Sequence, residues 1–247
     1  MIYSFFDVSE ASVVCDSGLR IDNELYEESV GRIFAFSDNE ISYSERIRRD
    51  NDRVRHLYAY ALLSSLVSEY KKKDKQNGYF KVKTPDFITP LERIKRNENG
   101  KPYFEHNDLF FSISHSGNIV MAALSEKEIG ADVQKRGVLR DTQKLANKLF
   151  TNEEQALDFY DVFCAKEATV KAIGEGIDRL SDTAVKKRTD SVTEGIRRAD
   201  KTEEILNTDK MYAYAKKFSS LHFAGTVGRI KTSTGEEYSF SVLEHKK

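Results

Sequence analysis

The sequence has no tryptophan, only two cysteines, and no apolar run as long as a membrane-spanning helix. Such a helix needs about 20 consecutive apolar residues, so we do not expect a membrane protein. The first residues also lack the basic start of a signal peptide. Without an export signal, Cys15 and Cys164 are expected to stay reduced, and a free cysteine is usually a small buried hydrophobe. These absences predict a cytoplasmic protein and argue against Cys164 as a nucleophile.

A strong net charge is missing too, because 39 Lys and Arg residues face 40 Asp and Glu residues, for a formal net charge of −1. No overall field therefore draws the chain toward nucleic acid or a membrane surface. A local arginine cluster leaves a nucleic-acid-binding hypothesis open, although Asp50 and Asp52 balance part of its charge. Its members are Arg46, Arg48, Arg49, Arg53 and Arg55.

Apolar residues outline the coarse organisation of the chain. Between residues 54 and 66 they recur every three or four positions, which predicts a helix with one buried stripe. Residues 178–210 are rich in charge and poor in apolar periodicity, so we expect loops or an insertion there. Short runs at 212–214, 221–223 and 238–242 predict strands. At 247 residues the chain is long enough for one large domain or two subdomains.

Residues 129–134 predict a strand that presents an acid. Apolar residues alternate with others through this segment, which is the period-2 pattern of a strand. Asp132 and Gln134 then share a face with Gly130, and residues two apart on a strand lie roughly 7 Å from each other. Both side chains can therefore reach one cation, directly or through water.

Residues 163–174 predict a helix that presents a second acid and two lysines, Lys166 and Lys171. Glu167 and Lys171 are four positions apart and share one face of a helix. Thr151 and Glu154 have the spacing of a capping box, which predicts a helix start ahead of this segment. Gly174 suits the left-handed residue that follows a helix. Acids on two separate elements, with lysines beside them, fit a magnesium site for a phosphorylated ligand.

Two further segments lie upstream. Residues 110–117 alternate into a strand that ends in Ser114-His115-Ser116-Gly117, and an apolar strand is expected at 119–124. Gly100, Lys101 and Pro102 follow Asn99 in a turn whose backbone the proline restricts. Ser-His-Ser is compatible with a serine hydrolase, but G-x-S-x-G and its strand-to-helix elbow are absent. A histidine in such a turn is more often a structural hydrogen-bonding residue than a catalyst.

The four segments together resemble a known family. Gly-Lys-Pro, Ile-Ser-His-Ser-Gly, Ile-Gly-Ala-Asp and Lys-Glu-Ala-x-x-Lys-Ala-x-Gly occur in the order and rough spacing of the 4′-phosphopantetheinyl transferases. The match runs from about Gly100 to Gly176, and it is weaker before that segment and poor after Ile177. The chain is similar to the larger, monomeric class of the family, the surfactin-synthetase-activating type. Each motif alone is a weak signal, whereas four in order are a strong one.

The resemblance implies roles for the acids and lysines. Asp132 and Glu167 would bind Mg²⁺, with Gln134 as a third oxygen ligand. Glu167 would also be the base that activates the acceptor serine, so the implied catalytic residues are Glu167, Lys171 and Asp132. Lys166 and Lys171 would lie near the pyrophosphate and the acceptor.

The resemblance also implies how coenzyme A is held. Arginines of the local cluster would contact its 3′-phosphate, the histidine its phosphates, and the Gly-Lys-Pro turn its adenine nucleotide. The residues implied in coenzyme A binding are Arg46, Arg55, Gly100, Lys101, Pro102, Ser114, His115, Lys166 and Lys171.

The fold implied by the resemblance is α+β, a pseudo-dimer of two similar subdomains that each contain an antiparallel sheet and a long helix. We place the subdomains at residues 1–126 and 127–247, with the active site between them in a monomeric protein. The implied activity is Mg²⁺-dependent transfer of the 4′-phosphopantetheine arm of coenzyme A to a serine of an apo acyl or peptidyl carrier protein. Adenosine 3′,5′-bisphosphate is released, and the carrier serves fatty acid, polyketide or nonribosomal peptide synthesis.

Two departures from the family pattern leave an alternative open. Gln134 stands where the family often has Glu, and it keeps an oxygen ligand but loses a charge. Phe163 stands where the family often has Trp, and it keeps the packing but loses the indole donor. The alternative hypothesis is a carrier-protein-binding module that has lost catalysis.

Overall fold

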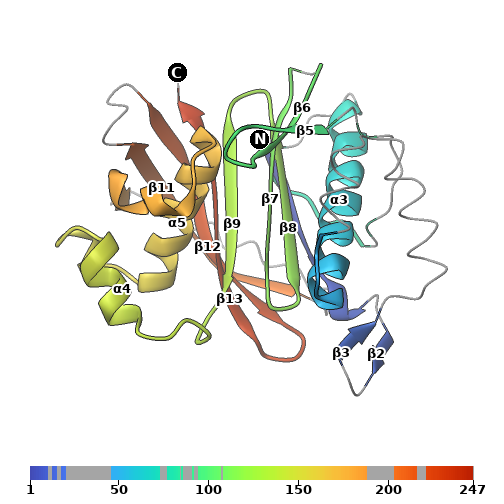
Figure 1. Cartoon of the computed structure of the whole chain (residues 1–247), viewed down its shortest axis with the longest axis horizontal. Helices are drawn as coiled ribbons and strands as arrows, with labels where there is room; N and C mark the ends of the chain where they lie inside the picture. Colours follow the sequence, from blue (N-terminus) through green and yellow to red (C-terminus); the bar gives the residue numbers. More distant parts are fainter. Residues whose placement is uncertain are drawn as a thin grey trace. The chain divides into compact units, whose positions relative to one another are not determined.

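The computed structural model describes residues 1–10, 13–15, 18–20, 46–72, 77–83, 85, 91, 94–106, 108–187, 203–215 and 221–246. The chain divides into two compact units, Met1–Glu126 and Lys127–Lys247. Helices and mainly antiparallel sheets occur in both, so the predicted α+β class is confirmed (Figure 1). In unit 1 the last strand pairs antiparallel with the first, and the same holds in unit 2. Any closer similarity between the units stays a prediction.

Unit 1 is built on a four-stranded sheet in the order β4-β1-β8-β7. Its strands are β1 (Ile2–Asp7), β4 (Gly78–Tyr79), β7 (Phe110–Ser116) and β8 (Ile119–Ser125). Only β4 runs parallel to its neighbour β1. The smaller elements are η1 (Val8–Glu10), the pair β2 (Val13–Cys15) and β3 (Gly18–Arg20), and the hairpin β5 (Ile94–Arg96) and β6 (Pro102–Phe104).

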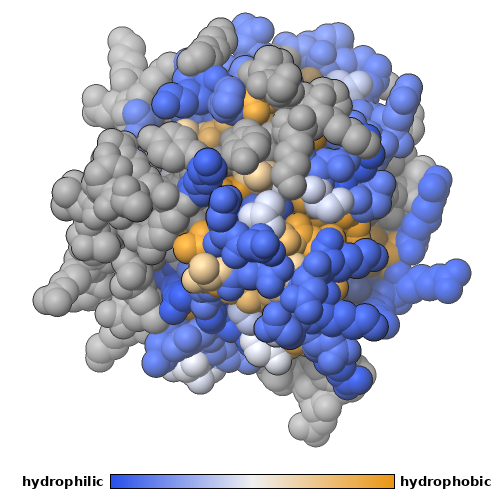
Figure 2. Space-filling model, turned by 90° about the vertical axis from the view of Figure 1, so that its left-hand side faces the viewer, coloured by the Kyte–Doolittle hydropathy of each residue, from blue (hydrophilic) through white to orange (hydrophobic). Residues whose placement is uncertain are grey.

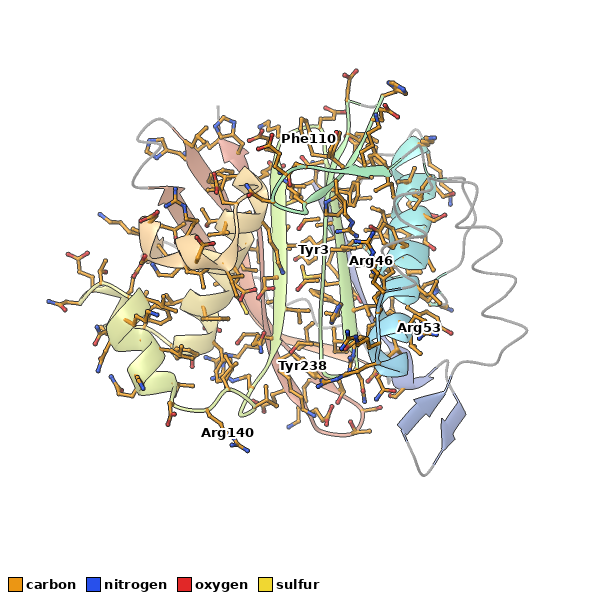
Figure 3. The ribbon with its side chains drawn as sticks, viewed as in Figure 1. Tyr3, Arg46, Arg53, Phe110, Arg140 and Tyr238 are labelled. Carbon is orange, nitrogen blue, oxygen red and sulfur yellow. The ribbon has the colours of Figure 1, made fainter. Side chains whose placement is uncertain are left out.

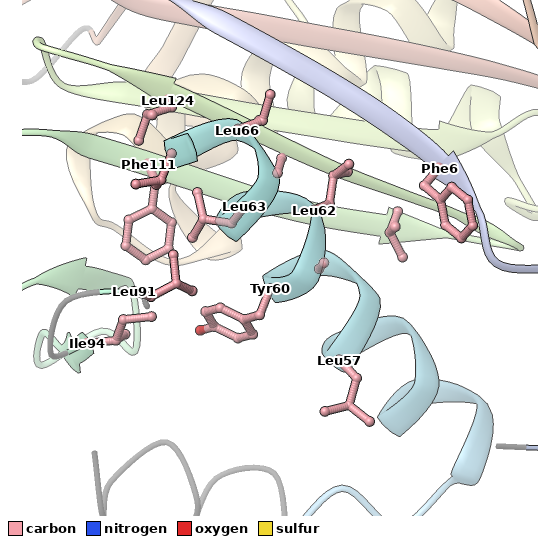
Figure 4. Close-up of a cluster of buried hydrophobic side chains, with 14 of the residues drawn as sticks. Phe6, Leu57, Tyr60, Leu62, Leu63, Leu66, Leu91, Ile94, Phe111 and Leu124 are labelled. Carbon is pink, nitrogen blue, oxygen red and sulfur yellow. The ribbon is translucent and has the colours of Figure 1, made fainter. Parts of the chain in front are cut away.

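Helix α3 (Asp50–Lys71) supplies the core of unit 1, which confirms the predicted helix and its buried stripe. Leu62, Leu63 and Leu66 are fully buried and belong to one cluster with residues of β1, β7 and β8 (Figure 4). Every residue of β8 is buried, which explains why its sequence is a continuous apolar run rather than an alternating one. The predicted strand pair at 110–124 is therefore confirmed, and Gly117 makes its tight turn with a φ of 55°.

Unit 2 is built on a five-stranded antiparallel sheet in the order β10-β11-β12-β13-β9. Its strands are β9 (Ile129–Lys135), β10 (Thr183–Lys187), β11 (Glu203–Ala215), β12 (His222–Thr232) and β13 (Glu237–Lys246). Its helices are α4 (Thr142–Leu149), η2 (Glu154–Ala156), α5 (Phe159–Ile173) and η3 (Ile177–Asp182). The predicted strands at 129–134, 212–214, 221–223 and 238–242 are all confirmed as parts of longer strands, apart from Leu221, which precedes β12.

Helix α5 has well-defined ends. The carboxylate of Asp158 caps its start by accepting hydrogen bonds from the backbone N–H groups of Tyr160 and Asp161. Gly174 ends it in the left-handed conformation with a φ of 74°, as predicted. Small residues face the sheet: Ala165, Ala168 and Ala172 pack in one cluster with side chains of β10, β12 and β13.

A close contact at Gly130 sets the distance between α5 and β9. A Cβ atom at this position would lie 1.7 Å from the carbonyl oxygen of Ala168 and 2.7 Å from the backbone nitrogen of Ala172. No flexible side chain is available there to move away, since both atoms belong to the helix backbone. Gly130 is therefore required by space, and it brings α5 down onto the face of β9 that carries Asp132.

Two predictions need correction. The capping box of Thr151 and Glu154 forms, but it precedes the short helix η2, and α5 begins only at Phe159. The loops expected at 178–210 are wrong for β10 and for the first residues of β11, which pair along the sheet. Backbone pairing with neighbouring strands decides these segments despite their charge, because strand preference depends on context. Residues 188–202 lie outside the described part.

The surface is consistent with the charged composition. Among the described residues, no helix is both long and apolar enough to cross a membrane. Hydrophilic residues cover most of the described part of the face in Figure 2, and hydrophobic residues show only between them.

Gly130→Ala is expected to lower the free energy of unfolding by about 3 kcal/mol, because the added methyl group must push α5 away from β9. Gly235→Ala is the matched control, since its φ is 85° and nothing lies within 4 Å of the added atom. That substitution should cost only about 1 kcal/mol of backbone strain. Urea denaturation of both variants measures the difference. Equal costs would show that the space at Gly130 is not limiting.

Candidate active site

Unit 2 brings three of the predicted residues together. Asp132 lies on β9, and Glu167 and Lys171 lie one turn apart on α5. Both of these elements are labelled in Figure 1. The Lys171 ammonium donates to Asp132 Oδ1 at 2.5 Å and lies 3.8 Å from Glu167 Oε2. The Asp132 side chain is only 2% exposed, against 17% for Glu167 and 31% for Lys171. The acid cluster, defined as Asp132, Glu167 and Lys171, is therefore a buried carboxylate beneath two groups that reach solvent.

The electrostatics of the acid cluster follow from one lysine serving two carboxyl groups. Burial and then the negative charge of Asp132 raise the pKa of Glu167 well above that of an ordinary glutamate, although Lys171 opposes this shift. Burial would lower the pKa of Lys171, but the two carboxyl groups outweigh it and raise that pKa instead. A second negative charge on this cluster is therefore costly unless a further cation is present.

The donor set fits a magnesium ion. Gln134 lies on the same face of β9 as Asp132, two residues along, and is half-buried. Among the described residues, no three His, Cys, Asp or Glu side chains gather into a metal-binding group. Mg²⁺, however, is usually held through one or two carboxylates together with substrate phosphates and water. Asp132 and Glu167 supply the two carboxylates, and a divalent cation would relieve their mutual repulsion.

Lys166 does not join the acid cluster. Its side chain has no exposed surface, and its ammonium lies 3.0 Å from Glu154 Oε2, whose side chain is 1% exposed. It also donates to the carbonyl oxygen of Thr183 at 2.7 Å. Successive helical residues are about 100° apart around the axis, so neighbours such as Lys166 and Glu167 point in different directions. A role in coenzyme A binding stays a prediction for Lys166, but its contacts are those of a buried structural ion pair.

Glu154 connects several segments to this lysine. Its Oε2 accepts from the backbone N–H of Thr151 at 2.7 Å, and its Oε1 accepts from that of Val185, also at 2.7 Å. A buried charge is tolerated when it is paired and fully hydrogen-bonded, and Glu154 meets both conditions. Lys166 and Glu154 together hold α5 against η2 and β10.

A second ion network holds the start of α5, and the sequence did not predict it. Arg136, directly after β9, donates to both carboxylate oxygens of Asp158, at 2.9 and 2.7 Å. Burial would raise the pKa of Asp158, but the hydrogen bond and charge of Arg136 outweigh it and lower that pKa. Arg229 on β12 lies 3.2 Å from the same carboxylate. The strand that carries Asp132 is thereby tied to the helix that carries Glu167.

Cys164 is a packing residue, as expected. It has no exposed surface, and its thiol donates to the carbonyl oxygen of Ser239 at 3.3 Å. Burial and then the charges of Asp132 and Glu167 raise the pKa of the thiol well above its usual value. A thiol with a raised pKa is a poor nucleophile.

The predicted coenzyme A residues of unit 1 belong to two local structures. Near the start of α3, Arg55 donates to the carbonyl oxygen of Gly117 at 2.6 Å and to Asp52 at 2.5 Å. It therefore supports the turn that follows Ser114, which is buried, and His115, which is exposed. Arg46 precedes the helix and is exposed (Figure 3). The assignment of these residues to the ligand stays a prediction.

The second local structure is the hairpin of β5 and β6, whose turn contains Gly100 and Lys101 and whose second strand begins at Pro102. Asn97 organises it, because its side-chain oxygen accepts from the backbone N–H groups of Asn99 at 3.1 Å and Lys101 at 2.8 Å. Gly100 has a φ of 85°, which only glycine adopts without strain. The predicted turn is present, and Asn97 is the organising residue that the motif did not reveal.

Comparisons with known proteins point to one family. Residues 128–225 match the family model described as "4'-phosphopantetheinyl transferase superfamily". This segment contains the acid cluster and Gln134. The resemblance predicted from the four motifs is therefore confirmed.

Individual relatives agree with the family match. The 4'-phosphopantetheinyl transferase Sfp of Bacillus subtilis is 26% identical over 179 residues, which cover 67% of this chain and 73% of the relative. The protein gsp of Aneurinibacillus migulanus is 32% identical over 101 residues, covering 36% and 41%. A putative member from Haemophilus influenzae is 32% identical over 105 residues, covering 37% and 45%. The chain thus spans less than half the length of the last two relatives.

The ion pair of Lys166 and Glu154 is expected to show strong energetic coupling. Lys166→Met should lower the free energy of unfolding by about 3 to 5 kcal/mol, because it leaves a buried carboxylate without its partner. Glu154→Gln should also destabilise, and the double variant should recover about 2 kcal/mol relative to the sum of the single losses. Urea denaturation of the three variants gives this coupling. Strictly additive losses would contradict a direct interaction.

Proposed function

We propose that this relative of the 4′-phosphopantetheinyl transferases transfers the 4′-phosphopantetheine arm of coenzyme A to a serine of an apo acyl or peptidyl carrier protein. The observation that carries the proposal is the acid cluster, which lies within the segment matched by the family. The reaction would depend on Mg²⁺ and release adenosine 3′,5′-bisphosphate. We also propose that the protein is a cytoplasmic monomer and that it binds neither nucleic acid nor membranes.

Asp132, Glu167 and Gln134 would hold the magnesium ion. When bound, the ion would supply charge neutralisation at the pyrophosphate of coenzyme A. Asp132 is nearly inaccessible and fixed by Lys171, which suits a residue that anchors a cation. Gln134 contributes an oxygen but no charge, so the phosphates of coenzyme A would supply much of the metal affinity.

Glu167 is the better candidate for the base because it is the more exposed of the two acids. The hydroxyl oxygen of the carrier serine would form a bond to the phosphorus atom next to the pantetheine arm. The bond from that phosphorus to the bridging oxygen would break, and the proton of the serine would pass to Glu167, directly or through water. Lys171, whose side chain is partly exposed, would stabilise the phosphates as they accept this charge.

Unit 1 would supply contacts to coenzyme A. Arg55 is committed to the carbonyl of Gly117 and to Asp52, so we assign it to supporting the turn beside His115. Arg46 is exposed and is the better candidate for the 3′-phosphate, since a guanidinium suits phosphate oxygens. The turn at Gly100, Lys101 and Pro102 would support the adenine nucleotide.

The alternative, a carrier-binding module without catalysis, loses one of its two supports. Phe163 is 9% exposed and stacks on Phe159, which stacks in turn on Phe150. The substitution of the family's tryptophan is therefore accommodated as core packing. Gln134 remains in favour of the alternative, and metal-dependent turnover distinguishes the two functions.

The direct test incubates the protein with coenzyme A, Mg²⁺ and a panel of apo carriers from fatty acid, polyketide and peptide synthesis. Mass spectrometry of each carrier should show the gain of one phosphopantetheine group. Asp132→Ala and Glu167→Ala should abolish this gain while remaining folded. Glu175→Ala, which removes a glutamate just beyond α5, should keep it. No gain on any carrier would favour the binding module.

Arg46→Ala is expected to weaken coenzyme A binding about tenfold and to leave dephospho-coenzyme A unaffected, because only the former carries the 3′-phosphate. Calorimetric titration of both ligands measures the difference. Arg140→Ala is the control, since this exposed arginine extends away from the ribbon in Figure 3. Equal weakening of the two ligands would show that Arg46 does not contact the 3′-phosphate.

A further inference from the structure

Strand β13 places two serines beneath helix α5. Ser239 pairs with Gln134 of β9, and Ser241 pairs with Asp132. Ser239 faces α5, because its hydroxyl donates to Asp161 of that helix at 2.8 Å. Alternate residues of a strand point to the same side, so Ser241 faces α5 as well. Leu243, two residues further on, packs in the cluster that contains Ala165, Ala168 and Ala172, which confirms the direction.

The two serines differ in how their hydroxyl groups are satisfied. Ser239 donates to Asp161 and accepts from Arg136 at 2.7 Å. Ser241 has no exposed surface, and its hydroxyl has no hydrogen-bond partner among the described residues. A buried hydroxyl without a partner destabilises the fold, so alanine would suit this position better if only packing mattered.

The position of Ser241 beside the acid cluster explains why this residue carries a hydroxyl group. Residues directly opposite each other in an antiparallel ladder have Cβ atoms about 5 Å apart on one face, so Ser241 lies beside Asp132. Asp132 is now held by the Lys171 ammonium. A divalent cation at the acid cluster would compete with that ammonium for the same carboxylate. The Asp132 carboxylate would then need another hydrogen-bond donor, one that the cation does not displace.

We propose that Ser241 is a positioning residue of the acid cluster, whose hydroxyl donates to the Asp132 carboxylate when a divalent cation replaces the Lys171 ammonium there, and so keeps that carboxylate oriented toward the cation. The inference rests on the proposed function and adds a residue to the same site. Ser241 touches neither the cation nor the substrate. Hydrogen-bond partners of metal-binding carboxylates commonly change metal affinity about 10- to 100-fold when they are lost.

The test compares Ser241→Ala with Ser239→Ala, two serines on the same face of the same strand. Mn²⁺ is titrated into each variant by calorimetry, first without and then with coenzyme A. The thermal unfolding of each variant is measured separately, without metal. Ser241→Ala should weaken Mn²⁺ binding about tenfold without lowering the melting temperature. Ser239→Ala should lower the melting temperature, because Asp161 and Arg136 lose a partner, and should leave Mn²⁺ binding unchanged.

Three outcomes overturn the inference. One is unchanged Mn²⁺ affinity in Ser241→Ala, another is equal weakening in both variants, and the third is no Mn²⁺ binding by the unaltered protein with or without coenzyme A. Failure of the proposed function can be told apart from these outcomes, because the function is tested by the mass gain of the carrier proteins and the inference by Mn²⁺ binding. Mn²⁺ binding that depends on Ser241, in a protein that modifies no carrier, would leave the inference standing and remove the activity.

Discussion

Helix α5 can lie against strand β9 only because residue 130 has no side chain. The carbonyl of Ala168 occupies the space where a Cβ atom would stand. This contact lets Asp132 on the strand accept a hydrogen bond from Lys171 on the helix, and Lys171 also lies near Glu167. The candidate chemistry therefore depends on a packing distance that is set two residues away from the reacting groups.

Charges then fix the helix along its length. Arg136 and Asp158 join the end of β9 to the start of α5, and Lys166 joins the middle of α5 to Glu154. These pairs are buried or half-buried and well hydrogen-bonded, which is the condition under which ion pairs specify geometry. The acid cluster differs from them, because its single lysine serves two carboxyl groups. This imbalance supports the proposal that the cluster holds a cation rather than acting as a structural pair.

The sequence predicted the strands around Asp132 and His115, the long helix of unit 1, and the residues that meet at the acid cluster. These are local patterns of period 2 or 3.6, and a spacing of four residues already determines that Glu167 and Lys171 share a face. It did not predict that Lys166, next to Glu167, turns into the core, because the packing of α5 decides that direction. Arg136, Asn97 and Ser241 were also missed, since their partners are set by tertiary folding or by a turn. The strand β10 and the first residues of β11 were missed because their neighbours, not their own apolar residues, define them.

The contacts of Glu154 have a consequence for motion. One carboxylate joins the backbone of Thr151, the ammonium of Lys166 and the backbone of Val185. Helix α5 cannot move away from the sheet without separating Lys166 from Glu154 and leaving two buried charges without their partners. We therefore expect its central amide protons to be protected against exchange with solvent until unit 2 opens as a whole, whereas the ends of the helix can fray. The acid cluster would keep its shape through the small fluctuations that accompany the arrival and departure of ligands.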